Sequence, residues 1–151
     1  MKLQFLQLGD LHLIRGPRNE DRLGALDHVI AAGRALDRLS AWIWPGDLTH
    51  AGMTIEIRNA LVDRTLRMCE VAPVVIVPGN HDPAGDLDFL AKLGGRWPIY
   101  VVTVPQVIRI PLAPEGVGDV AAIACVPYPS KAAIVGAGAP HDQINKIAAD
   151  A

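Results

Sequence analysis

Three short loops carry the residues of this sequence that could hold a metal ion or move a proton. Asp10 and His12 lie in the run GDLHL, Asp47 lies in PGDLTH, and the run GNHD occupies residues 79–82. Each run is common by chance, because turns use Gly, Asp and Asn for backbone reasons alone. Turn and capping chemistry is therefore the alternative to a catalytic role.

Carboxylates, imidazoles and an amide oxygen together form a mixed oxygen and nitrogen ligand set. Such a set suits Mn, Fe or Zn better than Ca, and no cysteine in these loops biases it towards soft metals. Two divalent cations about 3.5–4 Å apart polarise a phosphoryl oxygen and activate a water molecule. Because Asp10 and Asp47 would cancel only part of the charge of two cations, such a site would attract a phosphate.

An apolar run precedes each of these loops. The pattern predicts strands at 3–8, at 41–44 and from Val74, with helices at 20–40 and 54–71 between them. Strands that alternate with helices are typical of a parallel sheet covered on both faces. The intervals between the loops match the roughly 30 or more residues of a βαβ unit. Loops at the carboxyl ends of parallel strands share one edge, so we expect the three loops to meet there.

The pattern changes after a third predicted helix at 86–93. Residues 98–103, 106–112 and 119–129 form closely spaced apolar runs, which predict an antiparallel or mixed second sheet. The tail at 140–151 has a helical pattern and ends without Gly, Asn or Pro. We interpret this as a truncated chain.

The composition fits one α/β domain over residues 1–151. The chain has 151 residues, of which 50% are hydrophobic, enough for a single core. A net charge of −2 gives no general attraction to nucleic acid or to an anionic membrane.

Cys69 and Cys125 lie in apolar runs, which favours reduced thiols in a cytoplasmic protein. The first ten residues are too short for a signal-peptide core or a membrane span, so no membrane association is expected.

The ordered motifs D-x-H, G-D and G-N-H-D resemble those of the calcineurin-like metallophosphoesterases. The resemblance implies a four-layer α/β/β/α fold and two divalent metal ions, with Mn²⁺ expected first and Fe or Zn as alternatives. It implies that Asp10 and His12 hold the first ion, that Asp47 bridges both ions, and that Asn80 binds the second.

The same resemblance implies a catalytic role for the third loop. His81 would lie beside the phosphate, where it stabilises charge or protonates the leaving oxygen, and Asp82 would orient it. The glycine at position 79 also has a physical explanation, because a residue without Cβ lets the backbone turn sharply and approach the metals.

Within this superfamily, residues 11–21 and the run VPYPS at 126–130 look most like SbcD-type DNA-repair exonucleases. This implies two-metal hydrolysis of DNA phosphodiesters and an SbcC-type ATPase as partner. Arg15 and Arg18, beside the first motif, could hold a nucleic-acid backbone, and His50 could reach the phosphate or substrate. Solvated loop residues are the alternative for all three.

The later family motifs, a lone His and G-H-x-H, have no counterpart here. The five histidines stand at positions 12, 28, 50, 81 and 141. We therefore expect the second metal site to lack most of its ligands and this chain to turn over little substrate. Two other functions stay open. One is a phosphatase or cyclic-nucleotide phosphodiesterase acting on a small substrate, and the other is a non-catalytic binding module or fragment.

Overall fold

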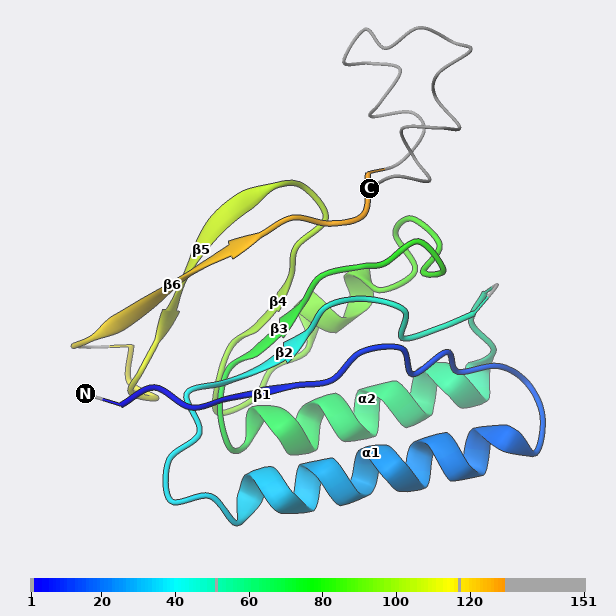
Figure 1. Ribbon diagram of the computed structural model, residues 1–151, viewed down its shortest axis with the longest axis horizontal. Helices are drawn as coiled ribbons and strands as arrows, with labels where there is room; N and C mark the ends of the chain where they lie inside the picture. Colours follow the sequence, from blue (N-terminus) through cyan, green and yellow to red (C-terminus); the bar gives the residue numbers. More distant parts are fainter. Residues whose placement is uncertain (1, 51, 117, 130–151) are drawn as a thin grey trace, which may run out of the picture.

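The computed structural model describes residues 2–50, 52–116 and 118–129 (Figure 1). Its elements, in chain order, are β1 Phe5–Gln7, α1 Arg18–Arg34, β2 Ala41–Trp44, α2 Ile55–Cys69, β3 Val74–Ile76, the 3₁₀ helix η1 Asp88–Lys92, β4 Ile99–Val101, β5 Gln106–Pro111 and β6 Val120–Cys125. Within the described ranges, no helix is long and apolar enough to cross a membrane.

Four strands form a parallel sheet in the order β1-β2-β3-β4. All of β3 is buried, as is β2 except for the partly exposed Ile43, which is how strands covered on both faces behave. The predicted parallel α/β core is confirmed.

Helices α1 and α2 lie side by side on one face of this sheet, and η1 packs into the same core (Figure 1). The indole N–H of Trp42 donates a 3.0 Å hydrogen bond to the carbonyl of Met68 on α2. The Trp42 ring also fills the space beside Gly33 on α1, where a Cβ would lie 2.0 Å from the ring. Trp42 of β2 therefore contacts both helices and helps to set how closely they pack on the sheet.

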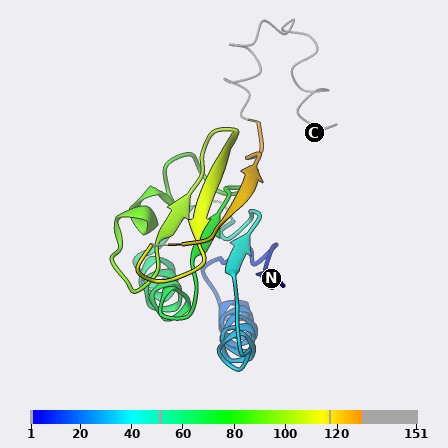
Figure 2. The same ribbon diagram turned by 90° about the vertical axis from the view of Figure 1, so that its left-hand side faces the viewer.

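Strands β5 and β6 form an antiparallel pair over the opposite face of the parallel sheet (Figure 2). A second core lies between the two sheets, with Val75 and Val102 from one side and Ile110 and Cys125 from the other. The predicted second sheet is confirmed. Among the described residues no helix covers its outer face, so the fourth layer of the family fold stays a prediction.

Three sequence-based assignments were wrong. Residues 98–103 were expected in the second sheet, but β4 pairs in parallel with β3. The crossover between them spans residues 77–98, and its helical part is the five-residue η1, shorter than the helix predicted at 86–93. The helix predicted at 20–40 ends at Arg34, because the chain must cross back for Ser40 to donate its amide to the carbonyl of Gln4.

The start of α2 agrees with the sequence. Thr54 is its N-cap, and the hydroxyl oxygen accepts a 3.3 Å hydrogen bond from the amide of Ile57. Cys69 and Cys125 are free and buried. The tail helix predicted at 140–151 lies outside the described residues.

Candidate metal centre

The first two loops run side by side beyond the ends of β1 and β2. The amide of His12 donates a 2.8 Å hydrogen bond to the carbonyl of Asp47. One residue further on, Leu13 donates to Leu48 at 2.9 Å, and the amide of His50 donates back to Leu13 at 3.0 Å. This short ladder continues the pairing of β1 with β2, so it holds the two motifs in a fixed register.

The third loop is tied to the second by the carboxylate of Asp82, whose exposed fraction is only 6%. One oxygen accepts hydrogen bonds from the amide and the hydroxyl of Thr49, at 2.8 and 3.1 Å. The other accepts from the amide of Gly79 at 3.0 Å. These bonds hold the loop backbone. That Asp82 orients the His81 ring stays a prediction.

Asp10, His12 and Asp47, three of the predicted metal ligands, lie together at the rim formed by the loops. Each offers a donor atom within 4.8 Å of those of the other two. Nε2 of His12 is 3.6 Å from Oδ1 of Asp10 and 3.9 Å from Oδ2 of Asp47. The Asp10 side chain is 84% exposed and that of Asp47 16% exposed, so the group opens to solvent on the Asp10 side.

These same three residues have left-handed backbone conformations, with φ of 56° at Asp10, 45° at His12 and 53° at Asp47. Such conformations are uncommon for residues with a Cβ and cost about 1–3 kcal/mol each. Strained residues persist where the surrounding structure enforces them, and they cluster at functional sites. Here they coincide with the ligands proposed on other grounds.

Two glycines make room for the Asp47 carboxylate. A Cβ on Gly79 would lie 2.3 Å from Oδ1 of Asp47 and 2.7 Å from its backbone nitrogen. Gly46 has a φ of 109°, and a Cβ there would lie 2.8 Å from Cα of Gly79. Only residues without side chains allow the two loops to approach so closely. The close approach of Gly46 and Gly79 leaves room for the Asp47 carboxylate, and the mixed donor set beside it fits a divalent cation.

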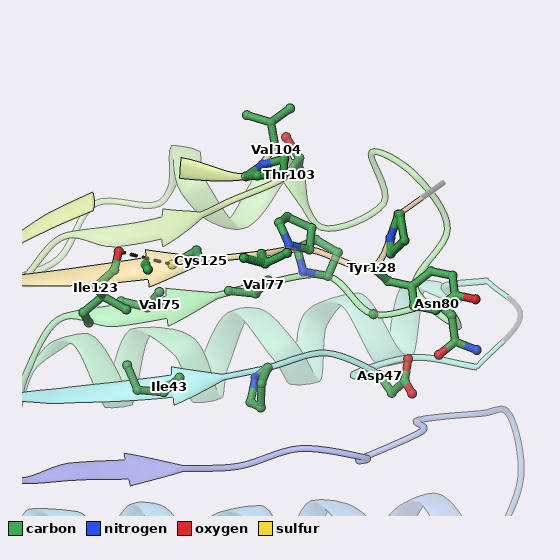
Figure 3. A pocket seen from close by; sticks show the side chains of 18 residues that line it. Ile43, Asp47, Val75, Val77, Asn80, Thr103, Val104, Ile123, Cys125 and Tyr128 are labelled. Carbon is green, nitrogen blue, oxygen red and sulfur yellow. Dashed lines mark hydrogen bonds between the residues drawn. The ribbon is translucent and has the colours of Figure 1, made fainter. Parts of the chain in front are cut away.

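Asn80, the remaining predicted ligand, is exposed on the third loop. It lines one cavity of about 670 Å³ together with Asp47, at the end where β2 and β3 finish (Figure 3). Asn80 is thus on the same rim as the group formed by Asp10, His12 and Asp47.

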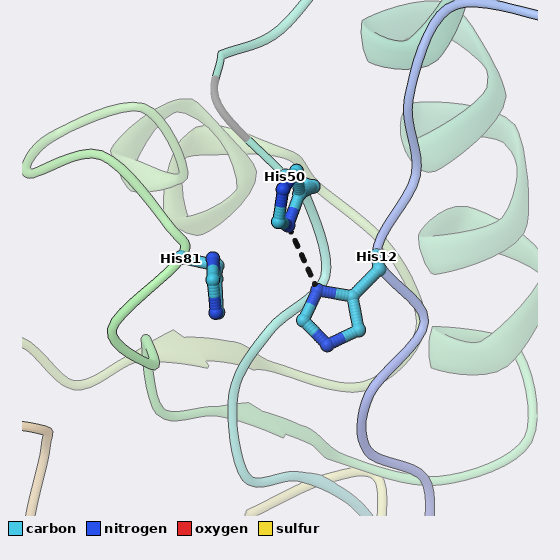
Figure 4. A group of neighbouring side chains, drawn as sticks. All are labelled: His12, His50 and His81. Atoms are coloured by element: carbon cyan, nitrogen blue, oxygen red, sulfur yellow. Dashed lines mark hydrogen bonds between the residues drawn. The ribbon is translucent and has the colours of Figure 1, made fainter.

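Three imidazoles gather beside this group (Figure 4). Donor atoms of His12, His50 and His81 all lie within 4.8 Å of one another. Nδ1 of His50 is 3.4 Å from Nδ1 of His12, and the rings of His50 and His81 are stacked with centroids 4.5 Å apart. The structure therefore places His50 against predicted site residues, although the spacing of the sequence gave it only a possible substrate contact.

Two arginines near the first motif were predicted to hold a nucleic-acid backbone. Arg15 and Arg18 are exposed. The pKa of the Glu56 carboxyl is lowered, mainly by a hydrogen bond with Thr54 and to a lesser degree by the positive charge of Arg15.

Sequence reasoning missed two contacts that shape the loops. Arg22, on α1, donates a hydrogen bond to the backbone carbonyl of His12. Thr49 is fully buried as the partner of Asp82. Neither contact has a signal in the sequence, because both join residues whose spacing matches no local motif.

Comparison with known proteins decides the family. A family model described as calcineurin-like phosphoesterase matches residues 3–134. The chain belongs to this family. The family implies divalent metal ions, and the His and Asp groups of the rim could bind them.

No curated protein matches this chain. Among solved structures, it is similar to the crystal structure of Pseudomonas putida nuclease MPE, with 24% sequence identity and a TM-score of 0.49. The similarity covers 69% of this chain and 50% of that chain. This chain therefore spans about half the length of the structure it matches.

Proposed function

We propose that this chain hydrolyses phosphodiester bonds in DNA with two divalent cations, at the low turnover expected from a second metal site without the later family motifs. The observation that carries the proposal is the convergence of Asp10, His12 and Asp47 on one rim, with donor atoms within 4.8 Å of one another. Three loops separated along the chain supply or support these donors. Turn chemistry alone does not require carboxylates and imidazoles to meet.

The chain's own residues divide into two ligand groups. Asp10 and His12 would hold one cation, Asp47 would contact both, and Asn80 would hold the second. Divalent cations at such a site supply Lewis-acid polarisation of the phosphoryl oxygen and make a water molecule more acidic. Mn²⁺ is the first candidate, because a set of carboxylate, amide and imidazole donors suits it.

His81 is the proposed proton donor to the leaving oxygen. Its ring centroid is 4.9 Å from that of His12, so it stands at the edge of the metal group. Its backbone amide is bonded to Asp47, which fixes the loop that presents the ring. A positioned imidazole contributes about 10²–10⁴-fold to a rate by proton transfer.

The exposed side chains of Arg15 and Arg18 support DNA as the substrate. Arg15 lies on the loop of the first motif and Arg18 is the first residue of α1. In a chain whose net charge is −2, a local pair of cations of this kind is what a phosphate backbone needs. An SbcD-type exonuclease that acts with an SbcC-type ATPase in the cytoplasm is the corresponding biological proposal.

One observation favours a second candidate, a phosphoesterase for small substrates. The cavity of about 670 Å³ beside Asp47 and Asn80 has the size of a small-molecule pocket. Of the described residues that line it, Asp47 alone carries a charge, and most of the others are apolar. An uncharged organic group attached to a phosphate would fit there better than a polyanion.

One assay distinguishes the two candidates. The protein is incubated with Mn²⁺ and either an end-labelled DNA duplex, bis(p-nitrophenyl) phosphate or p-nitrophenyl phosphate. The DNA proposal expects nucleotides released from the duplex, and Asp47→Asn as control should release none. Rapid cleavage of a p-nitrophenyl ester with intact DNA would favour the small-substrate enzyme. No Mn²⁺-dependent cleavage of any substrate would favour the non-catalytic module.

A further inference from the structure

The two ring nitrogens of His12 face two different sets of donors. Nε2 points to the carboxylates of Asp10 and Asp47, at 3.6 and 3.9 Å. Nδ1 lies 3.4 Å from Nδ1 of His50 (Figure 4). His81 completes the second set, which contains nitrogen donors only. The first set suits Mn, Fe or Zn, whereas the second set has no oxygen donor.

The spacing of the second set fits zinc. A tetrahedral zinc ion with Zn–N bonds of about 2.0–2.1 Å places two ligand nitrogens about 3.3–3.4 Å apart. The His12 and His50 nitrogens already have this separation, at 3.4 Å. A ring nitrogen of the partly exposed His81 lies within 4.8 Å of nitrogens of the other two. Because the rings of His50 and His81 are stacked, one of them must turn for both to point at the same ion. His50 itself is exposed, so an ion can enter from solvent.

We propose that His12, His50 and His81 form a zinc site that inhibits the phosphoesterase. Three neutral imidazoles leave one coordination position open, which water can fill. Imidazole donors bind Zn²⁺ much more strongly than Mn²⁺, which stands at the weak end of the divalent series. The site therefore selects zinc in the presence of manganese.

Inhibition follows from the single proton of a neutral imidazole. When Nδ1 of His12 binds zinc, the remaining proton is on Nε2. Nε2 then has no lone pair for a cation held by Asp10 and Asp47. The same zinc ion also occupies His81, the proposed proton donor. Zinc binding at the three histidines stands on the geometry alone, whereas the inhibition rests on the proposed function.

The binding test uses metal-free protein. Zinc affinity is measured by competition with a chromophoric chelator, and Mn²⁺ affinity by the loss of its free electron paramagnetic resonance signal. His50→Gln removes a ligand of the nitrogen set only, and Asp10→Asn removes one of the carboxylate set only. His28→Gln is the matched control, because His28 is exposed on α1.

His50→Gln should weaken zinc binding at least about tenfold, since loss of even an indirect partner of a metal ligand costs that much. It should leave Mn²⁺ affinity unchanged, while Asp10→Asn should do the reverse and His28→Gln should change neither. X-ray absorption of the zinc complex should give three imidazole ligands. Unchanged zinc affinity in His50→Gln, or an equal loss of zinc affinity in Asp10→Asn, overturns the site.

The inhibition is measured as the ratio of Mn²⁺-supported hydrolysis with and without added zinc, within each variant. The wild-type ratio should fall with zinc, and His50→Gln should need at least about ten times more zinc for the same fall. Equal sensitivity of the two proteins overturns the inhibition. Loss of zinc binding in His50→Gln together with absent hydrolysis in the wild type would refute the proposed function and leave the zinc site standing.

Discussion

The backbone amide of His81 donates a 3.0 Å hydrogen bond to Oδ1 of Asp47, across 34 residues of sequence. The residue expected to bridge the metals therefore also holds the loop that presents the expected proton donor. Any displacement of the Asp47 carboxylate moves both functions together.

Replacing Asp47 by Asn should separate these two roles. The amide oxygen can still accept the hydrogen bond from His81, but the negative charge between the cations is lost. We expect Mn²⁺ affinity to fall at least about tenfold and hydrolysis to be abolished, with little change in thermal stability. Manganese titration and cleavage of bis(p-nitrophenyl) phosphate measure these effects. Retained wild-type activity would count directly against the mechanism.

His81→Gln should damage the rate and spare the metals. The backbone contact with Asp47 does not involve the ring, so the loop should keep its position. Loss of a positioned proton donor should lower kcat by about 10²–10⁴-fold. Steady-state kinetics and manganese titration on the same preparation provide the check. A variant that loses manganese affinity as strongly as activity would show that His81 is a ligand.

Gly79→Ala should destabilise the protein. A methyl group there meets Oδ1 of Asp47 at 2.3 Å and its nitrogen at 2.7 Å, so loop or carboxylate must move. Overpacking of this kind costs about 1–3 kcal/mol. Gly94→Ala is the matched control, because nothing lies within 4 Å of the added atom. Urea denaturation of both variants gives the comparison. Equal stability would show that the packing of Gly79 against Asp47 tolerates a methyl group.

Asp82→Asn tests the hydrogen bonds by which the Asp82 carboxylate joins the second and third loops. Each carboxylate oxygen accepts an N–H, from Thr49 and from Gly79. An Asn amide would turn its NH₂ group towards one of these donors in either orientation. We expect a loss of about 1–3 kcal/mol in the free energy of unfolding. Asp37→Asn is the control, because Asp37 is exposed, and it should leave the free energy of unfolding almost unchanged. Equal losses in both variants would show that the Asp82 hydrogen bonds do not hold the two loops together.

An ion-pair group between α1 and α2 should make stability depend on pH. Desolvation raises the pKa of Asp27, but its hydrogen bonds to Arg64 and Arg67, both 2.6 Å long, outweigh this and lower it. Since the folded pKa lies below the unfolded value of about 3.9, the contribution is complete well above pH 4. It is lost as the pH falls through the folded pKa.

Asp27→Asn should therefore be less stable than the wild type at pH 7. The difference should shrink as the pH falls below about 4, where the wild-type carboxyl also becomes neutral. Urea denaturation from pH 2.5 to 7 measures this difference. A gap that stays constant over this range would show that the ion pairs do not contribute through charge.

The sequence predicted the elements that have strong local signals. The AWIW strand at 41–44 has the predicted bounds, because four apolar residues follow a polar loop and precede Pro45. The cap at Thr54 was equally clear. The strand at 99–101 was assigned to the wrong sheet, because its pairing depends on the length of a crossover and not on its own residues.

For the site, the sequence predicted which residues converge but not how they contact one another. Asp10, His12 and Asp47 are grouped as expected, since strand order alone brings their loops together. That the Asp82 carboxylate bonds Thr49, and that Nδ1 of His12 faces His50, depends on side-chain directions that no spacing encodes.

The left-handed backbone at Asp10, His12 and Asp47 has an evolutionary consequence. Glycine adopts this conformation without steric cost, and asparagine adopts it more easily than most other residues. In a descendant released from selection for the proposed hydrolysis, substitutions to Gly or Asn at these three positions should raise the melting temperature and become frequent. Residue types at these positions would therefore distinguish lineages that still need the reaction from those that keep only the scaffold.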